Sequence, residues 1–384
     1  MVLLAHVSDT HLGYKQYNLD EREEDFNRAF EEVVDRVIED HVDVMVHSGD
    51  FFDSFRPPVK ALYNAKRQLA RLKEKGVKVY VVLGDHDFPK RRGMPPHTLF
   101  ENELTLLGVK GRDGEVRRGC VVKAGGREVY VGGIMNMSRR YRNLLLDELR
   151  MVVNEGRKYW RSIVVMHQAI DVYLGYDFQL SIGEIPEGAN YYALGHLHSR
   201  RKMRLGEGVL AYAGSTEITR RDEISDWKRN GKGFYLVDLS GDVPDVQEVN
   251  LNVRPQLEVE VNYERLGEEV GRVVAGLEGG VKPVVHVKVK GSNIDRRGAL
   301  KVLEGAFSGK VLLWRPEFEE EAGQELTASS VKALSHRELL EEILGGDVAE
   351  LAWELFRILR GGRGRMEEAR RLVKEFFEAG YGDH

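Results

Sequence analysis

The chain has 384 residues, of which 42% are hydrophobic and 31% are charged, and its mean hydropathy is −0.39. This length predicts two or three domains, and no apolar run approaches the ~20 residues that a membrane-spanning helix needs, so we expect no membrane partner. The net charge of −5 disfavours a protein that coats nucleic acid by bulk charge, and the single cysteine, Cys120, excludes an internal disulfide. The N-terminus lacks the basic segment and cleavage pattern of a signal peptide, so we expect a cytoplasmic protein.

The first 240 residues alternate short apolar strands with helical segments. Helices are predicted at Asp20–Glu39, where Phe26, Phe30 and Val33 recur on one face, and at Val59–Lys75. Strands are predicted at Val2–Val7, Val42–His47, Val77–Leu83, Val129–Ile134, Ser162–Met166 and Tyr191–Leu194. This alternation predicts an α/β fold with a layered core over residues 1–240.

The pattern changes after Leu239. Val246–Val261 and Pro283–Val289 alternate apolar and polar residues, with a helix predicted between them at Tyr263–Gly276. These features predict a small α+β domain over residues 241–316. A charged stretch indicates a linker over residues 317–333, and residues 334–384 are predicted to be helical.

Carboxylates and histidines directly follow five of the predicted strands. The segments are Asp9-Thr10-His11, Gly49-Asp50, Gly84-Asp85-His86-Asp87, His167, and Gly195-His196-Leu197-His198. Because the carboxyl ends of strands in an open α/β sheet share one edge, we expect these groups to converge. His6 and His47, which lie inside apolar strands, are expected to be structural instead.

The candidate metal ligands are more numerous than a single ion requires. Oxygen and imidazole ligands without a thiolate suit Mn²⁺, Fe²⁺, Zn²⁺ or similar ions. Two ions that share a carboxylate therefore account best for the set, which comprises Asp9, His11, Asp50, Asp85, His167, His196 and His198.

The five motifs, in this order, resemble the calcineurin-like metallophosphoesterases, whose pattern is D-x-H, GD, GNH(D/E), a histidine after a strand, and GHxH. Within that superfamily the chain resembles the archaeal double-strand-break repair nuclease of the Mre-eleven/SbcD family. The resemblance covers at least residues 1–260 and rests on Ser8–Tyr14, Gly49–Phe52 with Arg56-Pro57, Tyr192–His198, Tyr212–Ser215 and Val253–Pro255. It implies a layered metallophosphoesterase β-sandwich flanked by helices, with a small α+β DNA-capping domain and a C-terminal helical segment.

The resemblance also implies a division of the ligands. One ion would be held by Asp9, His11, Asp50 and His198, and the other by Asp50, Asp85, His167 and His196, with Asp50 as the bridge. Two Mn²⁺ per chain are expected, with Fe, Mg or Zn as alternatives. His86 is expected to donate a proton or hydrogen bond to the transition state, oriented by Asp87.

Two positions depart from the family pattern. Asp85 replaces the asparagine of GNHD and adds a negative charge beside the ions and the phosphate. Asp53 stands where relatives carry a histidine. Either its charge repels the substrate backbone, or the residue caps the following turn.

Three further sets of residues are candidates for contacts with partners. Cations and an aromatic residue on loops after the motifs are candidates for DNA contacts, namely Lys15, Tyr17, Arg56, Lys90, Arg91 and Arg92. An apolar stripe for a homodimer comprises Leu62, Leu69, Leu99, Phe100 and Leu107, with ordinary intramolecular core as the alternative. By resemblance, a Rad-fifty/SbcC-type coiled-coil ATPase would bind the apolar faces of the last helices, at Leu351, Leu355, Phe356, Leu372 and Phe376, although these faces could instead pack on the chain itself.

The resemblance therefore implies a Mn²⁺-dependent DNA nuclease, acting as an exonuclease or endonuclease on double-strand breaks together with an ATPase. The departures at Asp85 and Asp53 leave open a DNA-end tether with weak or vestigial nuclease activity. A phosphodiesterase for small or protein substrates is a third possibility, which the C-terminal helices disfavour.

Overall fold

A computed structural model describes residues 1–88, 93–111, 114–277, 280–320, 340, 344, 346–360 and 366–380. These residues fall in two compact units, Met1–Glu320 and Glu321–His384. Among the helices that the structure describes, none is long and apolar enough to cross a membrane.

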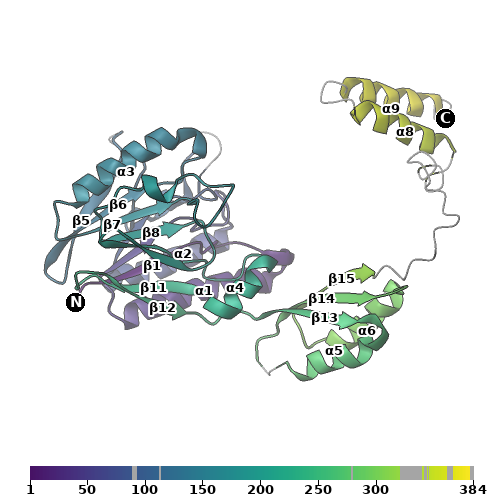
Figure 1. Cartoon of the computed structure of the whole chain (residues 1–384), viewed down its shortest axis with the longest axis horizontal. Coiled ribbons are helices and arrows are strands. Elements are labelled where there is room, and N and C mark those ends of the chain that lie inside the picture. The colour runs from purple at the N-terminus through teal and green to yellow at the C-terminus, as the bar shows by residue number, and fades with distance from the viewer. Residues whose placement is uncertain are drawn as a thin grey trace. The chain divides into compact units, whose positions relative to one another are not determined.

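Two six-stranded sheets form the core of the first unit (Figure 1). The first sheet has the order β12-β11-β1-β2-β3-β4, with β12 at Asp245–Asn250, β11 at Gly233–Asp238, β1 at Leu3–Val7, β2 at Val44–His47, β3 at Lys78–Val81 and β4 at Leu104–Leu106. The second has the order β5-β6-β7-β8-β10-β9, with β5 at Gly119–Ala124, β6 at Arg127–Ile134, β7 at Arg161–His167, β8 at Tyr191–Gly195, β10 at Gly208–Tyr212 and β9 at Arg201–Leu205. Strands β1 to β4 are parallel to one another, as are β6, β7, β8 and β10.

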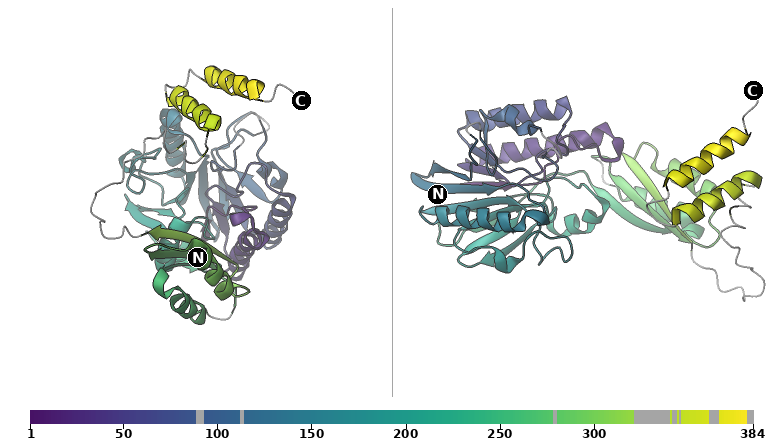
Figure 2. Two further views of the ribbon diagram at one scale, coloured as in Figure 1. Left: turned by 90° about the vertical axis from the view of Figure 1, so that its right-hand side faces the viewer. Right: turned by 90° about the horizontal axis from the view of Figure 1, so that it is seen from above.

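Helices cover the outer faces of both sheets, which gives four layers (Figure 2). Helices α1 (Asp20–Glu39) and α2 (Val59–Glu74) pack on the first sheet, and α3 (Arg142–Gly156) packs on the second. The period of two along each strand produces this layering. In β7, Ile163 and Val165 enter the core between the sheets, whereas Val164 and Met166 face α3. The predicted layered α/β sandwich is confirmed.

A smaller sheet follows, in which β13 (Gln256–Asn262), β14 (Val284–Gly291) and β15 (Leu313–Glu320) are parallel. Helices α5 (Leu266–Ala275) and α6 (Arg296–Phe307) bury their apolar faces against this sheet. Here the sequence prediction needs correction. The stretch Val246–Val261 is two strands, because β12 pairs with β11 in the first sheet and only β13 belongs to the small sheet. The expected linker starts inside β15, and its residues 321–333 lie outside the described residues.

A buried ion network fixes the connection between the first sheet and the small sheet. Arg254, just before β13, donates to both carboxylate oxygens of Asp25 on α1, at 2.5 and 2.9 Å. Arg22 donates to the same carboxylate at 2.7 Å, and all three side chains are buried. Because buried charges are costly unless paired, this network holds the start of β13 on the surface of α1.

The second unit contains α8 (Gly346–Arg360) and α9 (Met366–Gly380), which pack against each other. Ala349, Ile358 and Ala369 are buried, while Val348 and Phe356 are exposed. Two amphipathic helices bury little apolar surface of their own.

Candidate dinuclear metal centre

The residues that follow β1, β2, β3, β7 and β8 meet at one edge of the sandwich. The first three of these strands belong to the first sheet and the last two to the second, so the edge is shared by two sheets rather than one. Every residue of the predicted ligand set lies there. Ligand atoms within 4.8 Å of one another form the groups Asp9/His11/His198, Asp85/His167/His196, Asp9/Asp50/His167 and His11/Asp50/His86.

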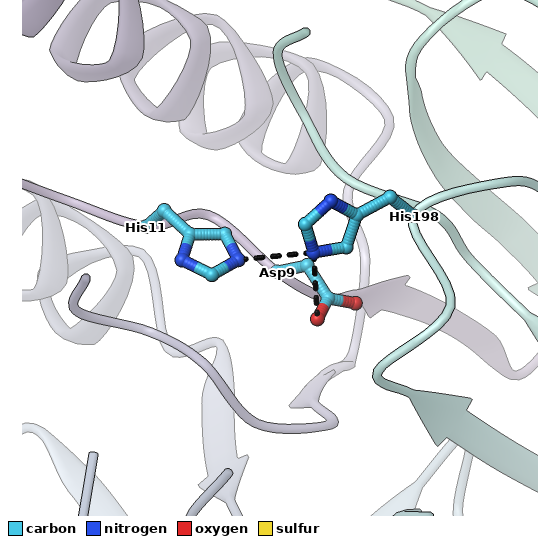
Figure 3. Close-up of side chains that lie close together, drawn as sticks. All are labelled: Asp9, His11 and His198. Carbon is cyan, nitrogen blue, oxygen red and sulfur yellow. Dashed lines mark hydrogen bonds and ion pairs between the residues drawn. The ribbon is translucent and has the colours of Figure 1, made fainter. Parts of the chain in front are cut away.

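The first group is buried and tightly spaced. Nε2 of His198 lies 3.2 Å from Nε2 of His11 and 3.8 Å from Oδ1 of Asp9 (Figure 3). Nitrogen ligands about 2.1 Å from a shared metal ion lie roughly 3 Å apart when they are adjacent in its coordination shell. The spacing of these donors therefore suits one cation.

The second group is more open to solvent. Oδ1 of Asp85 lies 3.1 Å from Nε2 of His167 and 3.2 Å from Nδ1 of His196. Asp50 lies between the groups, because its Oδ2 atom is 3.4 Å from Nε2 of His167 and 3.9 Å from Nε2 of His11. The donor set thus suits two ions with Asp50 between them.

Backbone strain concentrates at these ligands. Asp9, His11, Asp50 and His196 have φ values of 49°, 43°, 53° and 91°. Residues other than glycine rarely adopt positive φ, and each such residue costs of order 1–3 kcal/mol, so their clustering marks a functional site.

Two motif glycines are explained by close approach. A Cβ on Gly49 would overlap the His167 ring, and a Cβ on Gly84 would overlap the Asp50 carboxylate. The glycines of the GD and GDHD motifs therefore allow the loops of two strands to meet at the site.

The carboxylates make the cluster strongly attractive to positive charge. Burial alone would lower the pKa of His11, but Asp53, Asp50 and Asp9 raise it to about 9. Burial likewise opposes the charged form of His167, yet Asp50 and Asp85 hold its pKa well above the usual value. For Asp50, burial acts to raise the pKa, but His167 and His11 lower it overall. Metal ions that bind here would replace the protons on these imidazoles.

Several side chains behind the ligands carry no sequence motif and were not predicted. Nδ1 of His198 lies 2.8 Å from both Thr219 Oγ1 and Glu223 Oε1. Lys232 donates to the other oxygen of Glu223 at 2.5 Å. Burial acts to raise the pKa of Glu223, but Lys232 and His198 lower it below its usual value, so the carboxylate is ionised. On the other side of the site, Nδ1 of His167 donates to the backbone carbonyl of Ser48 at 2.8 Å.

The expectation that Asp87 orients His86 is wrong. The Asp87 carboxylate is buried and accepts hydrogen bonds from the backbone N–H groups of Phe51, Phe52 and Gly84 at 3.0–3.2 Å. Asp87 thus holds together the loops after β2 and β3. The half-exposed His86 ring donates instead from Nδ1 to the backbone carbonyl of Asp53 at 2.7 Å.

The two departures from the family pattern face the cluster. Asp85 is one of the residues of the second group, and its side chain is 45% exposed. The Asp53 carboxylate lies 3.3 Å from Nδ1 of His11. Its position beside His11 adds negative charge at the edge of the site. As predicted, His6 and His47 lie inside the structure, where His6 contacts Tyr191 Oη at 2.8 Å and His47 contacts Thr10 Oγ1 at 3.0 Å.

The residues expected to contact DNA differ in their exposure and in their partners. Lys15 is paired with Asp20 at 2.6 Å, and Arg56 is exposed beside the Phe55 ring. Tyr17 is half-buried, with its hydroxyl 3.3 Å from His286 of β14 and Arg315 stacked 4.7 Å from its ring centre. Lys90, Arg91 and Arg92 lie outside the described residues.

A cavity of about 350 Å³ opens beside Tyr17, between the loop after β1 and the small sheet. Three arginines that were not predicted line it, Arg220, Arg221 and Arg315.

The predicted apolar stripe for a homodimer is wrong for three of its five residues. Leu69 and Phe100 are buried in the core between the first sheet and its helices, and Leu107 is buried between the two sheets. Leu62 packs partly against the first of these cores, and Leu99 remains 62% exposed. The helical spacing of these residues thus reflects the chain's own core.

The residues expected to bind the ATPase lie on the two C-terminal helices. Leu351, Leu355 and Leu372 are half-buried, and so is Phe376. Phe356 is 40% exposed and stacks on Trp353 with ring centres 5.8 Å apart.

Comparison with known proteins agrees with this geometry. Residues 2–200 match the calcineurin-like phosphoesterase family, so the chain is a metallophosphoesterase. It is 38% identical over 293 residues to the DNA double-strand break repair protein Mre11 of Methanocaldococcus jannaschii, covering 75% of this chain and 77% of that protein. The Mre11 proteins of Sulfolobus acidocaldarius (38% identity, 77% of each chain) and Aeropyrum pernix (30% identity, 93% of this chain and 88% of that one) are also similar. The chain belongs to the Mre11 family, as the motifs predicted, and it is a metal-dependent phosphodiesterase.

Proposed function

We propose that this chain is a Mn²⁺-dependent DNA nuclease that processes double-strand breaks, as an exonuclease or endonuclease, in complex with a Rad-fifty/SbcC-type coiled-coil ATPase. The observation that carries the proposal is the convergence of carboxylates and imidazoles from five strand ends around Asp50. Oxygen and imidazole donors suit Mn²⁺, with Fe, Mg or Zn as alternatives. The names of the similar proteins, which are double-strand break repair proteins, support DNA as the substrate.

The residues have distinct roles in this proposal. Asp9, His11 and His198 would hold one ion, Asp85, His167 and His196 the other, and Asp50 both. When bound, two such cations would neutralise the charge of a phosphodiester and lower the pKa of the attacking water. His86 presents its ring at the exposed side of the cluster, where it can donate a proton or hydrogen bond to the leaving oxygen.

DNA contacts are proposed along the loops around the site. The cavity beside Tyr17 is lined by three arginines, which suit contacts to a phosphate backbone, although Arg221 is paired with Glu258 and Glu317. In this proposal the domain of β13 to β15, which the family resemblance describes as a DNA-capping domain, lies next to the path of the substrate. The excess of acidic residues elsewhere on the chain is compatible with such a local basic surface.

A homodimer is proposed through the exposed apolar residues near the start of α2. Val59 and Tyr63 are 81% and 71% exposed, and Leu99 is exposed as well. These residues, rather than the buried Leu69 and Phe100, are available to a second copy of the chain. Tyr63→Glu should convert the dimer into a monomer in light scattering; a variant that stays dimeric would exclude this surface.

The ATPase is proposed to bind the second unit. Two helices with apolar faces and little core of their own suit docking on a partner helix or coiled coil. Because residues 321–384 form a compact unit of their own, deleting residues 330–384 should abolish ATPase binding and spare metal-dependent hydrolysis. Co-purification of the truncated chain with the ATPase would exclude the docking role.

One assay separates the proposal from its alternatives. Purified chain is incubated with Mn²⁺ and either linear DNA or a chromogenic phosphodiester, and DNA-end binding is measured in parallel. A nuclease degrades the DNA. A DNA-end tether with vestigial activity binds ends and leaves them intact, and a phosphodiesterase for small substrates hydrolyses only the chromogenic compound.

A further inference from the structure

A buried polar cluster lies directly behind the first group of candidate ligands. It comprises Thr219, Glu223 and Lys232, whose exposed fractions are 5%, 3% and 2%. Glu223 lies directly before α4 (Ile224–Asn230), and Lys232 lies just before β11. These residues belong to none of the five motifs.

The two ring nitrogens of His198 face different partners. Nε2 faces His11 and Asp9, the other members of its group. Nδ1 lies 2.8 Å from Oε1 of Glu223, and the Thr219 hydroxyl donates to the same carboxylate oxygen. Because the Glu223 carboxylate also accepts from the Lys232 ammonium and the Thr219 hydroxyl, it acts as an acceptor toward the imidazole. The proton of the imidazole therefore belongs on Nδ1, which leaves the lone pair on Nε2 for a cation.

Lys232 completes the arrangement. Its ammonium donates to Oε2 of Glu223 at 2.5 Å, to Ser215 Oγ at 2.7 Å and to the backbone carbonyl of His198 at 3.0 Å. Lys232 therefore compensates the buried carboxylate and also fixes the backbone of the histidine that the carboxylate contacts. A buried ion pair seldom stabilises a fold better than packed apolar residues do, so stability alone does not account for this pair.

We propose that Glu223 is a positioning residue that fixes the tautomer and orientation of His198 for the metal ion of the first group. The inference rests on the proposed dinuclear centre. The proposed support concerns one ion, because the histidines of the second group have other partners. His167 donates to a backbone carbonyl, and His196 faces Asp85. Removing the Glu223 charge should therefore lower the affinity for one ion and leave the affinity for the other unchanged.

The test is a titration of the metal-free full chain with Mn²⁺, followed by calorimetry and by electron paramagnetic resonance. The wild type should bind two ions and give the signal of a coupled pair. Glu223→Gln should keep one ion at the wild-type affinity and bind the other about 10–100-fold more weakly. The matched control is Asp226→Asn, which alters a buried carboxylate of the adjoining helix α4 whose partners are Arg201 and Asn230. This control should bind both ions as the wild type does.

The outcomes are distinguishable. Two ions at unchanged affinity in Glu223→Gln, or equal weakening of both, would overturn the positioning role while leaving the dinuclear centre intact. Fewer than two ions in the wild type would overturn both the inference and the proposed function. If Glu223→Gln does not fold because Lys232 loses its partner, the double variant with Lys232→Met removes the buried cation, and the same criteria apply to it.

Discussion

The two groups of candidate ligands share Asp50 but differ in their surroundings. The side chains of Asp9, His11 and His198 are 0%, 4% and 14% exposed, and His198 is supported by side chains behind it. In the other group, Asp85 and His196 are 45% and 27% exposed. We infer that the first group is built to retain an ion, whereas the second faces substrate. The Asp85 departure from the family pattern therefore falls on the side where it can alter chemistry rather than folding.

The largest effect is expected from Asp50→Asn, because this residue belongs to both groups. The change should lower the affinity for both ions and reduce the rate of hydrolysis by on the order of 10³-fold. Metal analysis and a phosphodiesterase assay on the same sample measure the two effects. Asp43→Asn, which alters the carboxylate that accepts from the backbone of Leu3 at the other end of β2, is the control. Normal binding of both ions by Asp50→Asn would show that the two groups do not share Asp50 as a ligand.

His86→Ala should retain both ions and lose about 10²–10⁴-fold in activity, because it removes a donor to the transition state and no assigned ligand. His86 also lies within ligand distance of His11 and Asp50, so the metal content of the variant is informative. Loss of an ion would show that His86 is a ligand and that the assignment is wrong.

Asp85→Asn, which restores the family residue, is expected to raise turnover by less than about tenfold. One fewer negative charge would face the phosphate, and a charge this exposed contributes roughly 1 kcal/mol or less. Steady-state hydrolysis at saturating Mn²⁺ measures the change. Equal or lower turnover at normal metal content would show that the second group is adapted to the carboxylate.

The prediction with the least effect on catalysis concerns His6, which lies beside Tyr191 between the two sheets. Burial lowers its pKa to about 3 from the ordinary 6.5. The unfolded chain therefore takes up a proton on His6 between pH 6.5 and pH 3 while the folded chain does not, so stability falls as the pH falls through this range. In His6→Asn, the slope of the unfolding free energy against pH should decrease by up to about 1.4 kcal/mol per pH unit.

Denaturant unfolding of the metal-free chain between pH 4 and pH 7 measures that slope. His41→Asn, in an exposed turn, is the control and should leave the slope unchanged. An unchanged slope in His6→Asn would mean that His6 is protonated in the folded chain.

Much of the site was predictable because its residues sit in short motifs at strand ends. Asp9, Asp50 and His167 could be placed near one another from the α/β alternation alone, since strand ends define an edge. The sequence could not show that two sheets contribute to that edge. Strand pairing also decides that β12 joins the first sheet, because alternating residues in Val246–Val261 fit either sheet.

The supporting residues were not predictable for a different reason. Glu223 and Lys232 are ordinary charged residues in sequence, and only the fold buries them behind His198. Asp87 belongs to a recognisable motif, yet its role in holding two loops depends on backbone N–H groups that have no sequence signature. Leu69 and Phe100 have the spacing of a surface stripe and of a core alike, and the packing of α2 on the first sheet decides between them.

The central claim is that two ions bind at this edge and share Asp50. Anomalous diffraction at the manganese edge, from crystals grown with Mn²⁺, tests it directly. The account predicts two peaks about 3.5–4 Å apart, one beside Asp9, His11 and His198 and one beside Asp85, His167 and His196, with Asp50 contacting both. A single peak, or a second peak without contact to Asp50, would contradict it.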